Sequence, residues 1–260
     1  MLTERAAAEA VRAAGLAVPV HYAEVTGSTN SDLLRLAGEG APEWTVFVAN
    51  QQVAGRGRMG RTWVSSPGSS LLVSVLLRPS LAPAESTLLA LGAGAAMALA
   101  CEEACGVRAR CKWPNDVMVG GRKLGGVLVE AQVQEAEVQH AVIGAGVNLI
   151  QREEDFPPEL RQRATSMALE GGRPEAAILL TAYLGRLVRL CDTGQAAFRS
   201  TVLEAYRGLC DTIGRSVKAS TTNGSEVTGR AAAIGDSGEL IVRTSRGERR
   251  VGFGEVVHLD

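Results

Sequence analysis

A segment rich in glycine and arginine is the first part of the chain whose residue types could do chemistry. It runs QVAGRGRMGR over residues 52–61 and follows an apolar run that predicts a strand. Glycines let the backbone come close to a ligand, and Arg56, Arg58 and Arg61 carry forked donors suited to phosphate or carboxylate groups. The same composition also suits a solvated basic loop or an arginine–glycine segment that touches RNA.

A second group of reactive residue types stands at 112–116, where the sequence is KWPND at the end of a predicted strand. A lysine can hold an anion, an amide can read the edge of a base, and a carboxylate can bind Mg²⁺. Taken alone, the segment also fits a strand that simply ends in a turn.

Two further segments combine glycines with predicted strands. One is GRKLGGVLVE at 121–130, where Lys123 stands beside a double glycine, and the other is GAGVN at 144–148. Glycine weakens a strand unless something packs closely against it, so both segments favour a ligand lying against the backbone. A solvated hairpin and a bend in the sheet are the alternatives.

Alternating helix and strand signals surround these segments. Ser28-Thr29-Asn30 precede a leucine-containing stretch, and their side chains are expected to cap its exposed N–H groups. Further helices are expected at 3–14, 83–105, 174–192 and 195–210. Strands are expected at 20–25, 45–50, 71–77, 107–113, 117–119, 123–133 and 137–149.

The sequence pattern changes after Ile213. From there it predicts short strands separated by turn sequences at Asn223-Gly224, 236–238 and 245–247. This pattern predicts a small β-barrel. We therefore expect a catalytic domain at 1–210 and a second domain at 211–260, with every motif described above in the first.

Composition excludes several classes of protein. With 27 basic and 28 acidic residues the net charge is -1, so no overall attraction to nucleic acid or to an anionic membrane is expected. The five cysteines are predicted to be small buried side chains in a reducing compartment. The longest apolar run, 88–101, is expected to be too short to span a membrane, and charges at 4–12 interrupt any signal peptide. A cytoplasmic protein is predicted.

Together, the motifs resemble the catalytic domain of biotin–protein ligases. GRGRMG is followed about fifty residues later by KWPND, then by GRKLGG and GAGVN, with Ser-Thr-Asn ahead of them all. The resemblance covers about 24–150 and resumes at 164–166 and in the C-terminal β segment. It implies an α+β fold: a mixed sheet flanked by helices, as in class II synthetases, followed by a small SH3-like barrel.

The same resemblance implies a two-step reaction. ATP would activate biotin to biotinyl-5'-AMP, with Mg²⁺ present, and the biotinyl group would pass to a lysine of a biotin carboxyl carrier protein, a subunit of an acyl-CoA carboxylase such as acetyl-CoA carboxylase. No nucleic-acid or membrane partner is implied, and both a monomer and a homodimer stay open. Only 27 residues precede Ser28, fewer than a winged helix-turn-helix needs, so a monofunctional ligase without a DNA-binding domain is expected.

Site residues follow from the resemblance position by position. Lys123 would lie between the biotin carboxylate and the α-phosphate, with Arg56 and Arg58 holding the same anions. The biotin site would comprise Ser28, Thr29, Asn30, Gln52, Gly55, Arg56, Lys123, Gly126, Leu128, Gly144 and Gly146. The nucleotide site would comprise Arg58, Trp63, Lys112, Asn115 and Asn148, with Asp116 as the metal ligand.

Three other classes of protein share part of this pattern. A lipoate–protein ligase has the same fold and adenylate chemistry, but a different glycine loop and no GRGRxG and KWPND pair. A biotin-sensing repressor that also has ligase activity would need a DNA-binding domain. An RNA-binding protein using the arginine–glycine loop would be expected to carry net positive charge and aromatic platforms.

Overall fold

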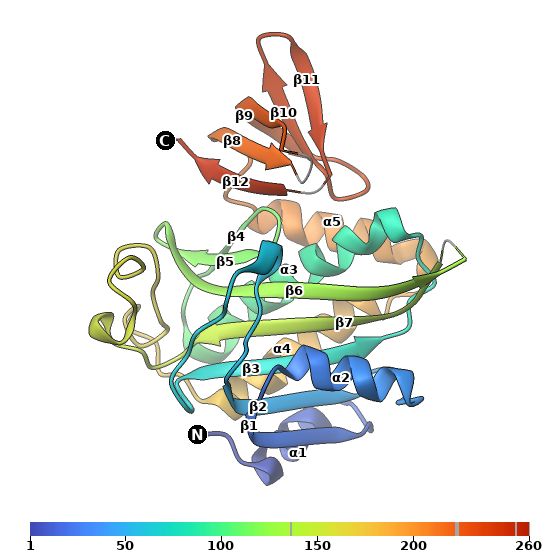
Figure 1. Ribbon diagram of the computed structural model, residues 1–260, viewed down its shortest axis with the longest axis vertical. Helices are drawn as coiled ribbons and strands as arrows, with labels where there is room; N and C mark the ends of the chain where they lie inside the picture. The colour runs from blue at the N-terminus through green and yellow to red at the C-terminus, as the bar shows by residue number, and fades with distance from the viewer. Residues whose placement is uncertain (136, 222–223, 253, 260) are drawn as a thin grey trace.

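The computed structural model describes residues 1–260 except 136, 222–223, 253 and 260, and it contains two β-sheets (Figure 1). The larger is a seven-stranded mixed sheet in the order β1-β2-β3-β7-β6-β5-β4. Its strands are β1 (Val20–Thr26), β2 (Val46–Gln52), β3 (Ser70–Leu77), β4 (Arg110–Lys112), β5 (Asp116–Val119), β6 (Arg122–Gln134) and β7 (Glu137–Asn148). Only β1 and β2 pair in parallel, and every other neighbouring pair is antiparallel.

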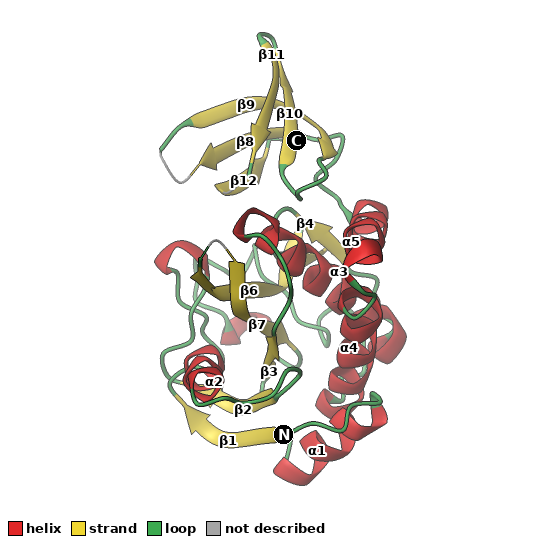
Figure 2. Ribbon diagram, turned by 90° about the vertical axis from the view of Figure 1, so that its right-hand side faces the viewer, coloured by secondary structure: helices red, strands yellow, loops and turns green. Residues whose placement is uncertain are grey.

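Helices cover both faces of this sheet (Figure 2). α2 (Thr29–Gly38) packs on one face against β2, β3 and β7. The other face carries α1 (Glu4–Ala13), α3 (Ser86–Cys105), α4 (Ala176–Cys191) and α5 (Gln195–Leu209). Because both faces are covered, all eight residues of β3 are buried, which explains why this strand is an almost unbroken apolar run.

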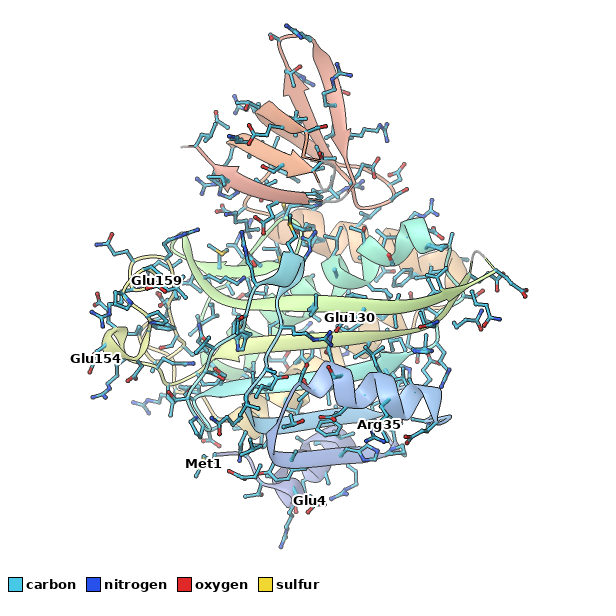
Figure 3. The ribbon with its side chains drawn as sticks, viewed as in Figure 1. Met1, Glu4, Arg35, Glu130, Glu154 and Glu159 are labelled. Atoms are coloured by element: carbon cyan, nitrogen blue, oxygen red, sulfur yellow. The ribbon has the colours of Figure 1, made fainter. Side chains whose placement is uncertain are left out.

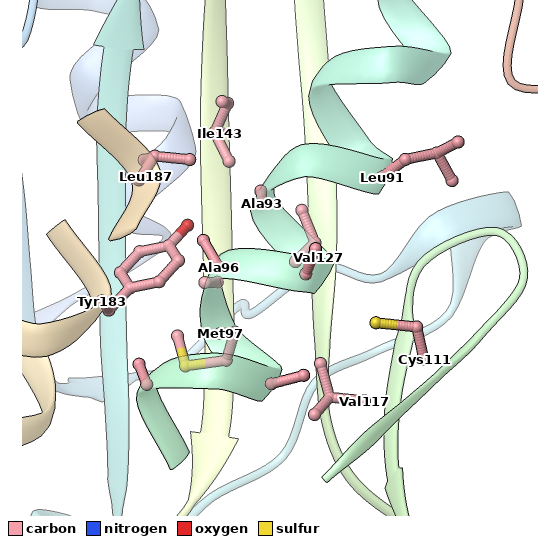
Figure 4. Close-up of a cluster of buried hydrophobic side chains, with 14 of the residues drawn as sticks. Leu91, Ala93, Ala96, Met97, Cys111, Val117, Val127, Ile143, Tyr183 and Leu187 are labelled. Carbon is pink, nitrogen blue, oxygen red and sulfur yellow. The ribbon is translucent and has the colours of Figure 1, made fainter. Parts of the chain in front are cut away.

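α3 is the central helix of the core. Thirteen of its residues are buried, and Figure 4 shows Ala93, Ala96 and Met97 between α4 and the sheet strands. Among the described helices it alone has the length and apolar composition to cross a membrane, so the expectation that this run is too short was wrong. In this fold 67% of the 18-residue apolar stretch within the helix is buried inside the protein, as expected of a core helix. The helix ends at Gly106, whose φ of 69° suits glycine.

The smaller sheet is antiparallel, in the order β11-β10-β9-β8-β12. Its strands are β8 (Ser216–Thr221), β9 (Glu226–Ile234), β10 (Leu240–Thr244), β11 (Gly247–Val251) and β12 (Gly254–His258). The predicted α+β fold, a helix-flanked mixed sheet with a separate C-terminal β unit, is confirmed. Within the described strands β11 and β12 do not pair, so closure into a barrel stays a prediction. The turn predicted at Asn223-Gly224 lies partly outside the described residues.

Trp113 joins the two sheets. It is 1% exposed, its backbone N–H donates to Thr212 Oγ1 at 3.0 Å, and its indole Nε1 donates to the Gly238 carbonyl at 2.9 Å. The tryptophan of the KWPND segment is therefore an anchor for the C-terminal sheet, while its neighbours face the site described next.

Candidate functional site

A cavity of about 590 Å³ opens where the ends of several elements meet. Its walls come from the start of α2, the end of β2, the arginine loop, the KWPND segment, β6, β7, residues of the 151–164 segment and Glu255–Val257 of β12. Every residue predicted for the site lines this cavity except Gly55. Gly55 instead lines a second cavity of about 770 Å³, to which Arg56 and Asn115 also contribute.

Buried polar groups gather at the start of α2. Thr29 donates from its backbone N–H and from Oγ1 to Gln52 Oε1, at 2.7 and 3.0 Å. Ser74 Oγ lies 2.7 Å from Thr29 Oγ1 and 2.6 Å from Asn30 Oδ1. Ser28 occupies the N-cap but makes no side-chain capping bond, so the expected self-capping was wrong. Gln52 from β2 satisfies the helix terminus instead, which a local pattern cannot reveal.

The glycines of β7 make room for other side chains of the protein. A Cβ on Gly144 would lie 2.1 Å from Asn30 Oδ1, and one on Gly146 would lie 2.8 Å from Trp63 Cε2. The expected reason for these glycines was a ligand against the backbone. The structure shows that they let two side chains approach the sheet along the cavity wall. Asn30 packs at Gly144, and Trp63 packs at Gly146, two residues further along β7.

The three arginines of the loop reach three different parts of the molecule. Arg56 Nη2 donates to Ser31 Oγ at 3.0 Å and Glu130 Oε2 at 2.9 Å. Arg58 Nη1 donates to Asn115 Oδ1 at 3.2 Å.

Arg61, at the far end of the loop, pairs with Glu255 of β12 at 2.5 Å. Loss of water around Arg58 lowers the pKa of its guanidinium. The base of the loop is closed between Gly55 and Trp63, because the Trp63 N–H donates to the Gly55 carbonyl at 2.9 Å.

Positive charge collects at the KWPND end of the cavity. Lys123 Nζ lies 2.5 Å from Asp116 Oδ1, across the β5–β6 pair. Lys112 also lines the cavity, and burial lowers the pKa of its ammonium while the nearby Asp116 carboxylate opposes that shift. Arg58 lines the same cavity, so three cations share this end with two carboxylates, Asp116 and Glu255. The excess of positive charge suits a ligand with several negative charges.

The two asparagines predicted to contact the base already have protein partners. Asn115 accepts from Arg58 and donates from Nδ2 to the Val127 carbonyl at 2.7 Å. Asn148 donates to the Thr165 carbonyl at 2.9 Å and accepts from Gln151 Nε2 at 3.1 Å. Trp63 Nε1 is buried and has no hydrogen-bond partner within the described part of the chain. Their contacts to a nucleotide stay predictions.

Residues that reach the site but were missed from the sequence include Ser74, Glu130, Gln151 and Glu255. Ser74 and Glu130 had a signal, since each is a polar residue within or at the end of an otherwise apolar strand. Gln151 and Glu255 lie outside every motif, and only the folded chain brings them to the cavity.

Comparison with known proteins identifies the family of the chain. The sequence profile of the biotin/lipoate A/B protein ligase family matches residues 22–148, and that of the biotin protein ligase C-terminal domain matches residues 212–259.

Among curated relatives, the bifunctional ligase/repressor BirA of Bacillus subtilis is 35% identical over 232 residues, covering 88% of this chain and 71% of that protein. The biotin–[acetyl-CoA-carboxylase] ligase of Paracoccus denitrificans is 34% identical over 243 residues, covering 89% and 97%.

A solved structure of the biotin protein ligase from Aquifex aeolicus in complex with biotin and ATP superposes with a TM-score of 0.77. It is 26% identical and covers 92% of this chain and 99% of that one. The two matching profiles, the shared fold and the extent of both alignments lead to one conclusion: the chain belongs to the biotin protein ligases of the biotin/lipoate A/B protein ligase family.

Proposed function

We propose that this enzyme uses ATP to convert biotin to biotinyl-5'-AMP and transfers the biotinyl group to a lysine of a biotin carboxyl carrier protein. The observation that carries the proposal is the continuity of one cavity from the buried polar cluster of α2 to the cationic end formed by Lys112, Lys123 and Arg58. Biotin has a small polar ring and an acidic tail, and ATP is a nucleoside triphosphate. The reaction therefore requires a polar site for the ring next to a cationic site for the phosphates.

The polar cluster suits the ureido ring of biotin. A ureido group offers two N–H donors and one carbonyl acceptor, and the side chains of Ser28, Thr29, Asn30 and Gln52 supply both donors and acceptors. Leu128, Gly126 and Gly144 give the apolar wall that the thiophane ring and the aliphatic tail need.

In the first step the biotin carboxylate attacks the α-phosphorus of ATP, and pyrophosphate leaves. Two anions must meet, so fixed positive charge is the main requirement. We assign this role to Lys123, with Arg56 and Arg58 on the other side. Lys112 is assigned to the phosphates, and Trp63, Asn115 and Asn148 to the adenosine part.

In the second step the amine of the carrier lysine attacks the biotinyl carbonyl carbon, and the bond to AMP breaks. The amine must lose a proton, and none of the three histidines lines the cavity. We assign no histidine to that transfer.

Mg²⁺ would reach the site with ATP. Within the part of the chain that the structure describes, no group of three acidic, histidine or cysteine side chains could hold a metal alone. Mg²⁺ is commonly held by one or two carboxylates together with the phosphates of a nucleotide, and Asp116 provides one carboxylate at the cationic end. The ion would add charge neutralisation there.

The remaining assignments are parts of the same proposal. Residues 1–210 form the catalytic domain and 211–260 a C-terminal domain, the enzyme acts in the cytoplasm, and its macromolecular partner is the carrier protein. No nucleic-acid or membrane partner is assigned, and a homodimer is compatible with this function.

The direct test is incubation of the purified enzyme with ATP, Mg²⁺, labelled biotin and an acetyl-CoA carboxylase carrier domain. Label is expected on one carrier lysine, and none is expected without ATP. A parallel reaction with labelled lipoate and a lipoyl domain tests the other branch of the family. Transfer of lipoate in place of biotin would overturn the proposal.

A further inference from the structure

Glu130 lies on β6 where the polar cluster of α2 meets the arginine loop. Figure 3 shows Glu130 on β6 near the start of α2, and its side chain is 26% exposed. It lies two positions beyond Leu128 and therefore on the same face of the sheet. Neither the sequence motifs nor the proposed chemistry gives this carboxylate a role.

One carboxylate oxygen of Glu130 joins two parts of the site. Oε2 accepts from Asn30 Nδ2 at 2.8 Å and from Arg56 Nη2 at 2.9 Å. Asn30 is 4% exposed and is held further by the Leu128 carbonyl at 3.3 Å. The first turn of α2 is therefore tied to the loop through a single acidic group.

The orientation of Arg56 follows from these contacts. Both of its hydrogen bonds, to Glu130 and to Ser31, come from Nη2. None of the described residues offers an acceptor to its Nε or Nη1. A guanidinium is rigid and planar, so fixing one nitrogen fixes the direction of the others. Arg56 also lines the site cavity, where its unpaired edge can meet an anion.

We propose that Glu130 is a positioning residue that holds Arg56 ready to bind the carboxylate of biotin. The proposal rests on the function proposed above. Without the negative charge, the Arg56 side chain would sample several rotamers, and binding the carboxylate would then require that freedom to be lost. Glu130 does not itself touch the substrate, and its effect should appear only through Arg56.

The test compares two ligands that differ only at the group Arg56 would bind: biotin, and biotinol, in which a hydroxymethyl group replaces the carboxylate. Dissociation constants are measured by calorimetry for the wild type, Glu130→Gln, Glu130→Asp, Arg56→Ala and the Glu130→Gln/Arg56→Ala double variant. Glu137→Gln, an exposed glutamate at the start of β7, is the matched control. Thermal unfolding checks that each variant is folded.

Glu130→Gln is expected to weaken biotin binding about tenfold, the size of one lost charge-assisted hydrogen bond, and to change biotinol binding less than about twofold. Glu130→Asp should recover part of the loss. The double variant should bind biotin no more weakly than Arg56→Ala alone, because both changes remove the same interaction.

Two results would overturn the inference: biotin binding by Glu130→Gln equal to wild type, or an equal loss for biotin and biotinol, which would place the effect on Asn30 and the ring. Failure of the proposed function is a different result. It would appear as a wild-type enzyme that does not bind biotin.

Discussion

At the residue scale, the ion pair between Lys123 and Asp116 is the most informative contact of the site. The cation that the family pattern places at the reacting atoms is already 2.5 Å from the carboxylate assigned to the metal. Asp116 can thus hold the lysine in position before substrate arrives, and a ligand phosphate would share that ammonium.

Lys123→Ala is expected to reduce biotin-dependent pyrophosphate exchange by a factor of about 10²–10³, the usual effect of removing one preorganised charge from a developing anion. Its melting temperature should change little, because the side chain is 36% exposed. Arg122→Ala is the control, since this neighbour pairs with Glu170 and does not line the cavity. Near-normal exchange in Lys123→Ala would remove the lysine from the mechanism.

Arg58 is predicted to retain the reactive adenylate. The sequence alone suggests that it reaches the ligand only when its loop closes, whereas the structure already holds it to Asn115. Arg58→Gly should still form adenylate but release it faster, so that biotin appears on lysines of a bystander such as serum albumin. Dilution of the bystander should decrease this labelling.

The control for Arg58→Gly is Met59→Gly, which adds comparable backbone freedom but removes no charge. The φ of Met59 is already 54°, in the region that favours glycine. If Arg58→Gly loses adenylate synthesis in proportion to transfer and labels no bystander, Arg58 acts in the chemistry itself.

At the scale of elements, β7 contributes one glycine to each half of the proposed site. Gly144→Ala should displace Asn30 and raise the KM for biotin about tenfold or more. The family resemblance places Gly146 with biotin, but its packing against Trp63 predicts that Gly146→Ala raises the KM for ATP instead. The added Cβ atoms would lie 2.1 Å from Asn30 and 2.8 Å from Trp63. Steady-state kinetics with each substrate varied in turn measures both effects.

Gly185→Ala in α4 is the control, because a Cβ there meets nothing within 4 Å and alanine favours a helix. If Gly144→Ala and Gly146→Ala both raised the same KM, the assignment of the two halves would be wrong.

The elements themselves could largely be predicted from the sequence, because a sheet covered on both faces needs apolar runs such as 70–77, and α3 needs a long one. The contacts between elements could not. Gln52 caps α2 from 23 positions away, and Arg61 meets Glu255 from 194 positions away. No local periodicity encodes such pairs. They follow from the topology that brings β2, β6 and β12 to one cavity.

At the scale of the whole molecule, the C-terminal sheet forms part of the site. The motifs all precede residue 211, so the sequence predicts that a chain cut there still binds biotin. The structure adds that Glu255–Val257 line the cavity and that Trp113 would lose its partners Thr212 and Gly238 in the shortened chain.

We expect a folded 1–211 fragment to keep biotin binding, measured by calorimetry, but to bind ATP more weakly. Loss of biotin binding in that fragment would place part of the biotin site in the C-terminal sheet.

The ion pair between Arg61 and Glu255 is the contact through which β12 holds the arginine loop. Its side chains are 64% and 28% exposed, so it is worth at most about 1 kcal/mol, and its loss should change affinities a few-fold only. Glu255→Gln should speed hydrogen exchange of the amides at 57–62 and weaken ATP binding two- to fivefold. Biotin binding should stay unchanged, because the biotin site proposed above lies at the opposite end of the cavity. Glu226→Gln, which removes an exposed pair with Lys218 in the same sheet, is the control.

High salt should diminish the difference between wild type and Glu255→Gln, since screening weakens an exposed pair. Equal exchange of the loop amides in both proteins would mean that the loop is held by its own closure between Gly55 and Trp63, and that β12 only borders the cavity.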